Sequence, residues 1–453
     1  MPVSKNSDLP LVFILLTILL DMVGLGIILP VLPQLILELT GETVARSAMV
    51  GGYLVFIYAF LQFVFSPILG NLSDRYGRRP VLLLSLLGLT ADYMIMGFAP
   101  TIGLLFLGRA LAGISGAAVA TATAYIADIT PPGKRSQRFG LIGAAFGLGF
   151  IIGPVIGGEL GEFSPRAPFY LAAALAFSNF MFGLFILPES LGKRKRRRFN
   201  IKRANPVGAI LAFRPFPAII WLLGALFLFA LAIQAYPAVW NFFTIERFDW
   251  TPSQIGRSLA IFGLLFALVQ AVLIGPVIRR FGESTTVLLG LSAAGVAFFG
   301  TAFIHTPIGL YGYLVIGAFS GLTAPAINGL LSRQIPDNAQ GELQGAVTAI
   351  NSLTAIIAPL AATQLFSYFT SSPNGPGEPG YFPGVSFFGA GVLIVFSFLI
   401  FFYTVKRFDL QFLKNDLPPA KPPDIAKPGE IAVQPPDLTP TDKSPTAPDG
   451  NEK

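Results

Sequence analysis

The sequence has no cysteine, and His305 is its only histidine among 453 residues. The absence of cysteine excludes disulfides, thiolate metal sites and cysteine nucleophiles. The chain also lacks an HExxH zinc motif and a glycine-rich loop ending in Gly-Lys-Ser or Gly-Lys-Thr, which excludes most zinc proteases and P-loop ATPases. We therefore expect no catalytic residue, no metal and no other cofactor. A carboxylate-based hydrolase inside a membrane is the enzyme class that stays open.

Charge is scarce as well. Only 12% of the residues are charged, whereas soluble domains average about 25%. Hydrophobic residues make up 53% of the chain, and the mean hydropathy is +0.67. A chain of this composition is expected to have the lipid bilayer as its solvent.

Long apolar runs divide the chain into twelve predicted spans. Crossing about 30 Å of hydrocarbon takes roughly 20 apolar residues in a helix. The first run is too long for a cleaved secretory signal and has no basic start, so we keep it as a span. The predicted spans are Leu9–Leu37, Ala48–Leu69, Pro80–Phe98, Ile102–Ile126, Phe139–Leu160, Ala167–Leu187, Pro215–Ala235, Ile255–Ile278, Thr285–Ile304, Ile308–Leu331, Leu343–Phe369 and Pro383–Val405.

Lysine and arginine are distributed unevenly between the predicted loops. Cytoplasmic loops carry the excess of basic residues, and an even number of spans places both termini on one side. With cytoplasmic termini, Arg109 falls within a span and the other basic residues fall inside, except Arg46, Arg166, Arg247 and Arg257. The net charge of +7 then reflects topology rather than nucleic-acid binding. The basic run 193–198 is interpreted as a cytoplasmic anchor rather than a nuclear-targeting segment.

The two halves of the chain repeat each other at an offset of 205 residues. Matching pairs are Gly70 and Gly275, Arg75 and Arg280, Gly77 and Gly282, Pro131 and Pro336, Gly140 and Gly345, and Pro154 and Pro359. We predict an all-α polytopic membrane protein with twelve transmembrane helices in two pseudo-symmetric six-helix bundles. Its parts are an N-terminal bundle (1–188), a basic cytoplasmic linker (189–214), a C-terminal bundle (215–406) and a disordered Pro-rich cytoplasmic tail (407–453).

Three charged residues lie inside predicted spans of the first half: Asp21, Asp92 and Arg109. An embedded charge costs about 2.5 to 3.5 kcal/mol on insertion scales, so each one needs a reason. Asp92 and Arg109 lie eight residues on either side of the turn at Pro100 and Thr101, which places both about 12 Å deep. They are either a buried ion pair that only fixes packing or, together with Asp21, a proton-coupling site whose protonation responds to conformation and ligand.

The predicted loop between spans two and three reads Gly70-Asn71-Leu72-Ser73-Asp74-Arg75-Tyr76-Gly77-Arg78-Arg79-Pro80. Gly77 permits a tight left-handed turn, and Arg78 and Arg79 can hold the lipid headgroup boundary. Asp74 is either a solvated loop acid or a gate that caps a helix N-terminus across the cytoplasmic cleft when that side is shut. The gating-loop residues are Gly70, Asp74, Arg75, Gly77, Arg78 and Arg79.

Small residues mark span five, and single polar residues mark several other spans. Glycines four apart let another helix approach closely, and a proline bends the helix, as in Gly149, Gly153, Pro154, Gly157 and Gly158. Polar side chains within spans either line a cavity or join neighbouring helices. The candidates are Gln62, Gln234, Asn241, Gln270, Asn328 and Asn351, whereas His305 is interpreted as a boundary residue.

These motifs resemble those of the major facilitator superfamily, specifically the tetracycline/proton antiporter branch of its drug exporters. The resemblance covers nearly all twelve spans. It is carried by Gly70-x-Leu72-Ser73-Asp74-Arg75-x-Gly77-Arg78-Arg79, Leu107-Gly108-Arg109-x-x-Ala112-Gly113 and Gly149-x-x-x-Gly153-Pro154-x-x-Gly157-Gly158. It implies antiport by alternating access, drug-like substrates, and functional positions at Asp21, Gln62, Asp92 and Arg109.

The second half departs from this branch at two positions. By resemblance, tetracycline exporters carry a histidine in span eight and an aspartate in span nine, which handle the metal-chelated substrate and the proton. Here Phe266 and Ala294 occupy those positions. The substitutions argue against tetracycline itself as the substrate and leave proton coupling to Asp21 and Asp92.

The sequence therefore predicts proton-coupled efflux of a small amphipathic or drug-like molecule. The alternative within transport is an exporter of a native metabolite such as a sugar or an amphipathic product, and the remote alternative is the membrane hydrolase. We expect a monomer in the bacterial inner membrane, with both termini cytoplasmic. The expected partners are a small-molecule substrate, protons and lipid, with no nucleic acid.

Overall fold

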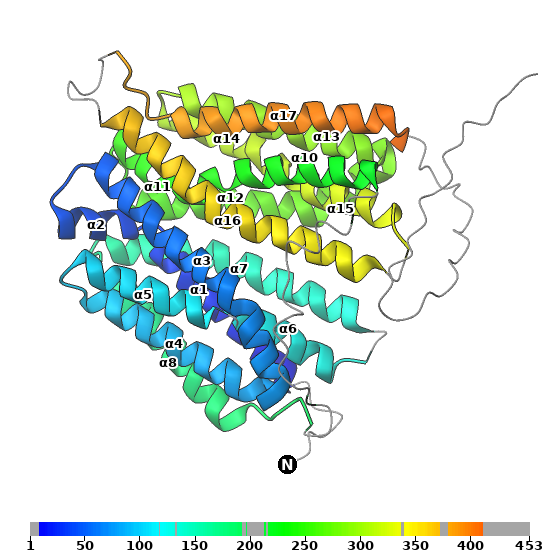
Figure 1. The fold of residues 1–453 in the computed structure, drawn as a ribbon. Helices are drawn as coiled ribbons and strands as arrows, with labels where there is room; N and C mark the ends of the chain where they lie inside the picture. The colour runs from blue at the N-terminus through cyan, green and yellow to red at the C-terminus, as the bar shows by residue number, and fades with distance from the viewer. Residues whose placement is uncertain are drawn as a thin grey trace, which may run out of the picture.

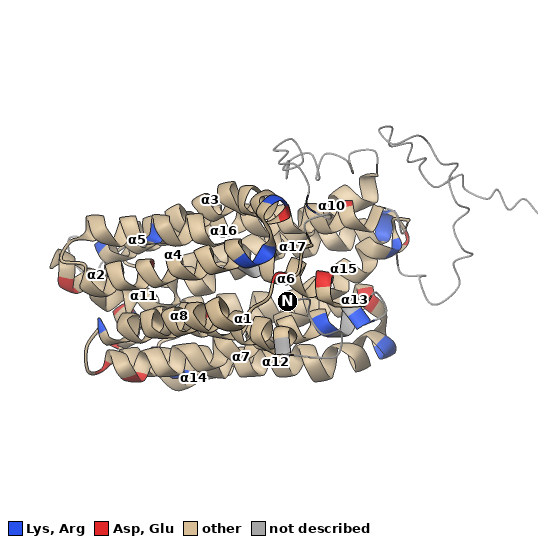
Figure 2. Cartoon of the chain, turned by 90° about the horizontal axis from the view of Figure 1, so that it is seen from below, with Lys and Arg blue, Asp and Glu red and all other residues tan. Residues whose placement is uncertain are grey.

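The computed structural model describes residues 9–116, 118–131, 134–192, 196, 213, 216–336, 339–371 and 379–410. This part of the chain is helical and has no strand. It contains 11 helices long and apolar enough to cross a membrane. In Figure 2, Lys, Arg, Asp and Glu gather towards the ends of the helices, with long uncharged stretches between. The polytopic all-α fold class is therefore confirmed.

The first half of the chain forms one group of helices, drawn in blue to blue-green in Figure 1. Its helices are α1 (Leu9–Ile28), α2 (Leu32–Thr40), α3 (Val44–Tyr76), α4 (Arg78–Phe98), α5 (Ile102–Ser115), α6 (Ala118–Ile129), α7 (Arg135–Gly161) and α8 (Ala167–Ile186). The second group, drawn in green to orange, packs alongside it. It contains α10 (Pro217–Ile233), α11 (Ala235–Phe248), α12 (Pro252–Leu268), a π-helical turn η4 (Val269–Leu273), α13 (Ile274–Phe303), α14 (Pro307–Ala318), a 3₁₀ turn η5 (Phe319–Leu322), α15 (Thr323–Arg333), α16 (Gln340–Thr370) and α17 (Val385–Arg407).

The count of 11 differs from the predicted twelve because spans eight and nine are continuous in the structure. Residues Pro252–Phe303 form one helical run. Gly282 has non-helical backbone angles, with φ +79°, and bends this run between the two predicted spans. The bend lets one run enter and leave the membrane, so two crossings are present.

Other boundaries differ from the predictions for local reasons. The first predicted span is split between α1 and α2 at Pro30, which has no backbone N–H to continue the helix. The predicted loop at 70–80 is almost entirely helical, because α3 runs to Tyr76 and α4 begins at Arg78. The seventh predicted span ended at Ala235, but α11 continues the helical run to Phe248. The predicted linker and tail lie mostly outside the described residues.

The internal repeat is visible in the backbone. Gly77, between α3 and α4, has φ +113°, and its repeat partner Gly282 has φ +79°. Pro154 lies inside α7, and its repeat partner Pro359 lies inside α16. Equivalent turns and prolines therefore recur at the predicted offset of 205 residues.

The two halves contact each other at the end where α7 finishes and α12 begins. In the described part of the chain, the hydrogen bonds between the halves lie at this end and involve Asn241, Ser253 and Arg257 of the second half. The start of α3 also packs there against the second half, since a Cβ atom at Gly51 would lie 2.7 Å from Phe242 Cζ. We call this region the joined end.

Alanine replacements at the repeated glycines test the role of the two bends. Gly282→Ala should lower the free energy of unfolding by about 1 kcal/mol, because alanine resists positive φ while nothing lies within 4 Å of the added Cβ. Gly77→Ala should cost more, since its Cβ would also collide with the Glu189 carboxylate. Thermal unfolding in detergent measures both. Gly275→Ala in helix α13 is the control and should be neutral or stabilising; equal melting temperatures for all three variants would contradict the account.

Candidate functional site

Asp92 and Arg109 form a buried ion pair between α4 and α5. Asp92 is 0% exposed and Arg109 is 6% exposed. Gly108 makes room for the pair, because a Cβ atom there would lie 2.8 Å from Asp92 Oδ1. Asp92 Oδ1 and Arg109 Nε have no hydrogen-bond partner among the described residues. The predicted equal depth of these two residues thus brings them together, and the pair still has hydrogen-bonding capacity to spare.

Asp21 lies on α1 in the same region of the first half. It is partly buried. The carboxyl group is close enough to Tyr58 of α3 and Tyr93 of α4 to interact with both electrostatically. One helical turn further on, Gly24 faces Tyr93, since a Cβ atom at Gly24 would lie 3.0 Å from the tyrosine oxygen. The three embedded charges are therefore grouped around two tyrosines that the sequence analysis did not single out.

Gln62 connects α3 to a break in the fourth span. Its Nε2 donates to the Tyr58 hydroxyl at 3.2 Å and to the carbonyl of Gly116 at 3.2 Å. Gly116 ends α5 just before α6 begins, so its carbonyl is not fully used by a continuous helix. Gln62 satisfies that carbonyl and fixes the position of the break.

Gln270 makes a similar contact in the second half. It lies in the π-helical turn η4, and its Nε2 donates to the carbonyl of Gly321 at 3.4 Å. Gly321 lies in η5, which interrupts the tenth span, and it is the repeat partner of Gly116. Single π turns often mark functional sites. Each half therefore has a glutamine that reaches from its second span to a break in its fourth.

The remaining predicted cavity residues lie in different surroundings. Asn241 Nδ2 donates to the carbonyl of Leu29 at 2.5 Å, which places it at the joined end. Gln234 lies at the junction of α10 and α11. Asn328 Oδ1 is buried without a hydrogen-bond partner among the described residues, and Asn351 is exposed on α16. Among the described residues, no hydrogen bond joins these four to Gln62 or Gln270.

The glycines of span five face two helices. Three of them, spaced by four residues, approach α1 so closely that a side chain would collide with it: Gly149, Gly153 and Gly157. Gly158 faces the second half, where a Cβ atom would lie 2.5 Å from the carbonyl oxygen of Pro252 in α12. One face of α7 therefore packs against α1 of its own half, and the adjacent face packs against α12 of the other half.

Two acids at the end of α7 bind the first turn of α12. Glu159 accepts hydrogen bonds from Ser253 Oγ at 2.8 Å and Arg257 Nε at 2.9 Å. Glu162 accepts from the backbone N–H of Ser253 at 3.1 Å. Acids are stabilising at a helix N-terminus. These contacts strengthen the joined end, and they could not be predicted from the sequence because the partners are more than 90 residues apart.

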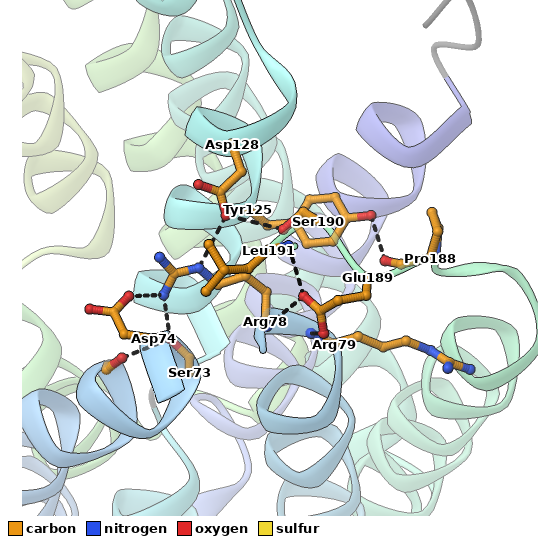
Figure 3. A network of polar contacts seen from close by, with 11 residues as sticks. Ser73, Asp74, Arg78, Arg79, Tyr125, Asp128, Pro188, Glu189, Ser190 and Leu191 are labelled. Carbon is orange, nitrogen blue, oxygen red and sulfur yellow. Dashed lines mark hydrogen bonds and ion pairs between the residues drawn. The ribbon is translucent and has the colours of Figure 1, made fainter. Parts of the chain in front are cut away.

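Arg78 is the centre of the polar network at the opposite end of the first half (Figure 3). Its Nη1 lies 2.6 Å from Asp74 Oδ1 and 2.6 Å from Ser73 Oγ. Its Nε lies 3.2 Å from Asp128 Oδ2 at the end of α6. Asp74 is thus paired within its own half in this conformation. Its predicted contact across the cytoplasmic cleft stays a prediction for the conformation in which the cytoplasmic side is shut.

Glu189 caps the start of α4 (Figure 3). Its carboxylate accepts from the backbone N–H of Arg78 at 2.8 Å and of Arg79 at 3.3 Å. These are N–H groups of the first helical turn, which have no partner within the helix. This cap was not predicted, and its signal in the sequence is an acid placed directly after the sixth span and just before a basic run.

The second half repeats one ion pair of this network with its charges reversed. Arg78 and Asp128 correspond, at the offset of 205, to Glu283 and Arg333. Arg333 Nη2 lies 3.0 Å from Glu283 Oε1. In both halves the turn after the second span is therefore braced against the end of the fourth.

The single histidine lies just beyond the end of a helix, and its place at the membrane boundary stays a prediction. His305 follows α13 and its Nδ1 lies 2.6 Å from Arg247 Nη2. Nearby, the Tyr381 hydroxyl donates to Glu246 Oε1 at 2.5 Å. Burial and the adjacent Glu246 carboxylate raise the pKa of Tyr381, so its hydroxyl stays protonated and can donate. This cluster holds the loop before α17 against the end of α11.

The positions where the second half departs from the antiporter branch are apolar in their surroundings. Phe266 packs against Phe262, with ring centroids 5.8 Å apart, and Ala294 is buried at 1% exposure. Among the described residues, no group of three or more His, Cys, Asp or Glu side chains is placed to hold a metal ion.

The fold and the embedded charges define a multi-pass membrane transporter, and sequence comparison gives its family. The Major Facilitator Superfamily model matches residues 14–359 and 236–436. The chain belongs to this superfamily, whose members are transporters and not enzymes, and whose drug exporters need no cofactor.

Curated relatives place the chain in the branch that the sequence motifs indicated. It is 42% identical over 370 residues to the tetracycline resistance protein, class C, of Escherichia coli, a match that covers 82% of this chain and 93% of the relative. It is 31% identical over 375 residues to multidrug resistance protein 2 of Bacillus subtilis, covering 80% and 90%. The predicted resemblance is confirmed.

Solved structures support the fold. A bacterial homologue of the human lysosomal transporter Spinster has a TM-score of 0.71 at 16% identity, covering 93% of this chain and 100% of that one. The human organic anion transporter MFSD10 has a TM-score of 0.64 at 23% identity, covering 87% and 99%. At these identities the likeness concerns the fold alone.

Removing one member of the buried ion pair should be costly. We expect Arg109→Ala to lower the free energy of unfolding by about 3 to 5 kcal/mol, because it leaves the Asp92 carboxylate buried without its cation. The double variant Asp92→Leu/Arg109→Met removes both charges and should recover most of that loss. Unfolding in SDS, followed by the fluorescence of the three tryptophans, measures both. A double variant no more stable than Arg109→Ala would show that the charge pair is not the cause.

Truncating Glu189 tests the cap on α4. Glu189→Ala removes both acceptors and should destabilise the protein by about 1 to 2 kcal/mol, the usual cost of a lost helix cap. Glu189→Gln keeps one acceptor oxygen and should fall between the wild type and Glu189→Ala. Ser190→Ala, which removes one neighbouring hydrogen bond to Asp128, is the matched control and should cost less. If Glu189→Ala unfolds at the wild-type temperature, the cap does not stabilise the helix.

Proposed function

We propose that this protein exports a small amphipathic or drug-like molecule in exchange for protons by alternating access. The observation that carries the proposal is the Asp92–Arg109 pair buried within the first half, with Asp21 in the same region. The names of the curated relatives, tetracycline and multidrug resistance proteins, support a drug-like substrate.

Proton exchange provides a reason for acids to be embedded in hydrocarbon. A carboxylate there is costly in free energy when it is charged and unpaired, so whether it binds a proton depends on which ligand or cation lies beside it. One charge that moves through 100 mV supplies about 2.3 kcal/mol, enough for roughly a 40-fold substrate gradient. The membrane potential would then drive export without a nucleotide cofactor.

The distribution of basic residues supports an orientation. Arg46, Arg166, Arg247 and Arg257 are the arginines assigned to the outside, and each lies at or near the joined end or the loops beside it. We therefore assign the joined end to the outer surface of a bacterial inner membrane, with the termini in the cytoplasm. The conformation described here is then shut on the outside, and a single chain holds the complete pathway.

The substrate is expected to be recognised without a metal ion. Phe266 and Ala294 replace the histidine and aspartate that the tetracycline branch uses for metal-chelated substrate, and both lie in apolar surroundings. Phe262, which is partly buried, stacks on the buried Tyr236 with ring centroids 5.3 Å apart. Exposed aromatic faces favour flat, amphipathic or cationic molecules, so Phe262 and Phe266 are the candidates to contact such a substrate.

Efflux assays in inverted membrane vesicles test the proposal. The probes are ethidium and tetracycline with magnesium, each measured with and without a proton gradient. We expect the wild type to transport ethidium only when a proton gradient is present. In Asp21→Asn and Asp92→Asn the transport rate should fall at least about tenfold, because neither amide can carry a proton.

The controls separate the parts of the proposal. Glu38→Gln changes an acid in α2 outside the charged group and should transport like the wild type. Export that persists after the gradient is collapsed would rule out proton antiport. If the wild type transports neither probe, the proposal of a drug-like substrate is wrong and export of a native metabolite is favoured instead.

A further inference from the structure

Tyr58 lies between the buried ion pair and Gln62. The Arg109 guanidinium stands over the Tyr58 ring, with 5.7 Å from Cζ to the ring centroid. On its other side the Tyr58 hydroxyl accepts the hydrogen bond from Gln62 Nε2 at 3.2 Å. Contacts therefore continue from Asp92 through Arg109 and Tyr58 to Gln62.

The position of Tyr58 is fixed by the backbone. A Cβ atom at Gly113 of α5 would lie 2.6 Å from the Tyr58 carbonyl oxygen, so α3 and α5 are in close contact at this residue. Arg109 comes from the same α5 helix, one turn before Gly113. The close contact leaves little slack between α3 and α5, and the Arg109 guanidinium lies over the Tyr58 ring, so we expect a shift of the arginine to act on that ring.

The second half has the glutamine contact but not the rest of the chain of contacts. Gln270 reaches Gly321 just as Gln62 reaches Gly116. At the offset of 205, however, Tyr58, Asp92 and Arg109 correspond to Gly263, Ala297 and Leu314. The same helix break is therefore held in both halves, and only the break in the first half is linked to a charged pair.

We propose that Tyr58 is a positioning residue that couples the protonation of Asp92 to the substrate side chain Gln62. The inference rests on the proposed function, since it needs a proton on Asp92 and a substrate near Gln62. When Asp92 takes a proton, Arg109 loses its counter-charge and moves relative to the Tyr58 ring. The Tyr58 hydroxyl then moves away from Gln62 Nε2, which keeps only its hydrogen bond to the Gly116 carbonyl. The charged and titratable groups around this path are Asp21 of α1, Tyr58 of α3, Asp92 and Tyr93 of α4, and Arg109 of α5.

Substrate affinity as a function of pH distinguishes coupling from packing. The probe is whichever of ethidium and tetracycline the wild type exports in the vesicle assay, and binding to the purified full chain is measured at pH 6 and pH 8. For the wild type we expect affinity about tenfold weaker at pH 6, within the usual range of coupling between two sites. Tyr58→Phe keeps the ring under Arg109 but removes the hydroxyl. The ratio of its affinity at pH 8 to its affinity at pH 6, which we call the pH ratio, should fall below about threefold.

Two further variants complete the test. Gln62→Met removes the donor from the other end of the same hydrogen bond and should reduce the pH ratio in the same way. Tyr53→Phe, an exposed tyrosine on the same helix, should keep the wild-type pH ratio. A Tyr58→Phe protein that keeps the full pH ratio, or that binds more weakly by the same factor at both pH values, overturns the proposal. If the wild type exports neither probe or shows no pH dependence, the proposed function fails first and the coupling inference falls with it.

Discussion

The cost of placing charge in hydrocarbon is the constraint on which the rest of the structure depends. Asp92 and Arg109 neutralise each other inside the first half, and Gly108 leaves the space that lets them meet. Replacing such a pair with apolar residues is often neutral or stabilising, so a buried ion pair is weak evidence for a role in stability. Its presence here is better explained by a function that needs a mobile proton, with the arginine as the counter-charge.

Close helix packing is the second requirement, because two bundles that rock must still touch. The glycines of α7 divide between two neighbours: three face α1 within the bundle, while Gly158 faces α12 of the other bundle. Glu159 and Glu162 then hold the first turn of α12 through hydrogen bonds that can break without leaving a buried charge. The contact between α7 and α12 therefore combines close helix packing with partly exposed hydrogen bonds that can break, as expected of an interface that opens and closes.

Much of the fold followed from patterns within one segment of sequence. Apolar run length predicted the crossings, and the offset of 205 identified Gly77 and Gly282 as equivalent before their positive φ values were known. Asp92 and Arg109 could be paired because they flank one short turn symmetrically. Each of these predictions needed only local geometry or an internal repeat.

The remaining features depend on contacts between distant segments. Glu189 caps a helix that begins 111 residues earlier, and Glu159 meets Ser253 across the boundary between the halves. Neither partner can be inferred without the packing of the helices between them. Tyr58 was missed for a different reason: a tyrosine in an apolar span is ordinary, and only the approach of α5 at Gly113 places it between Arg109 and Gln62.

The most direct test of the central claim is the release of protons when substrate binds to the purified protein in weakly buffered detergent solution. If the embedded carboxylates exchange a proton for substrate, addition of the transported probe acidifies the solution with the wild-type protein, and Asp21→Asn/Asp92→Asn abolishes this signal. Saturating substrate that releases no proton from the wild type near neutral pH would contradict the account.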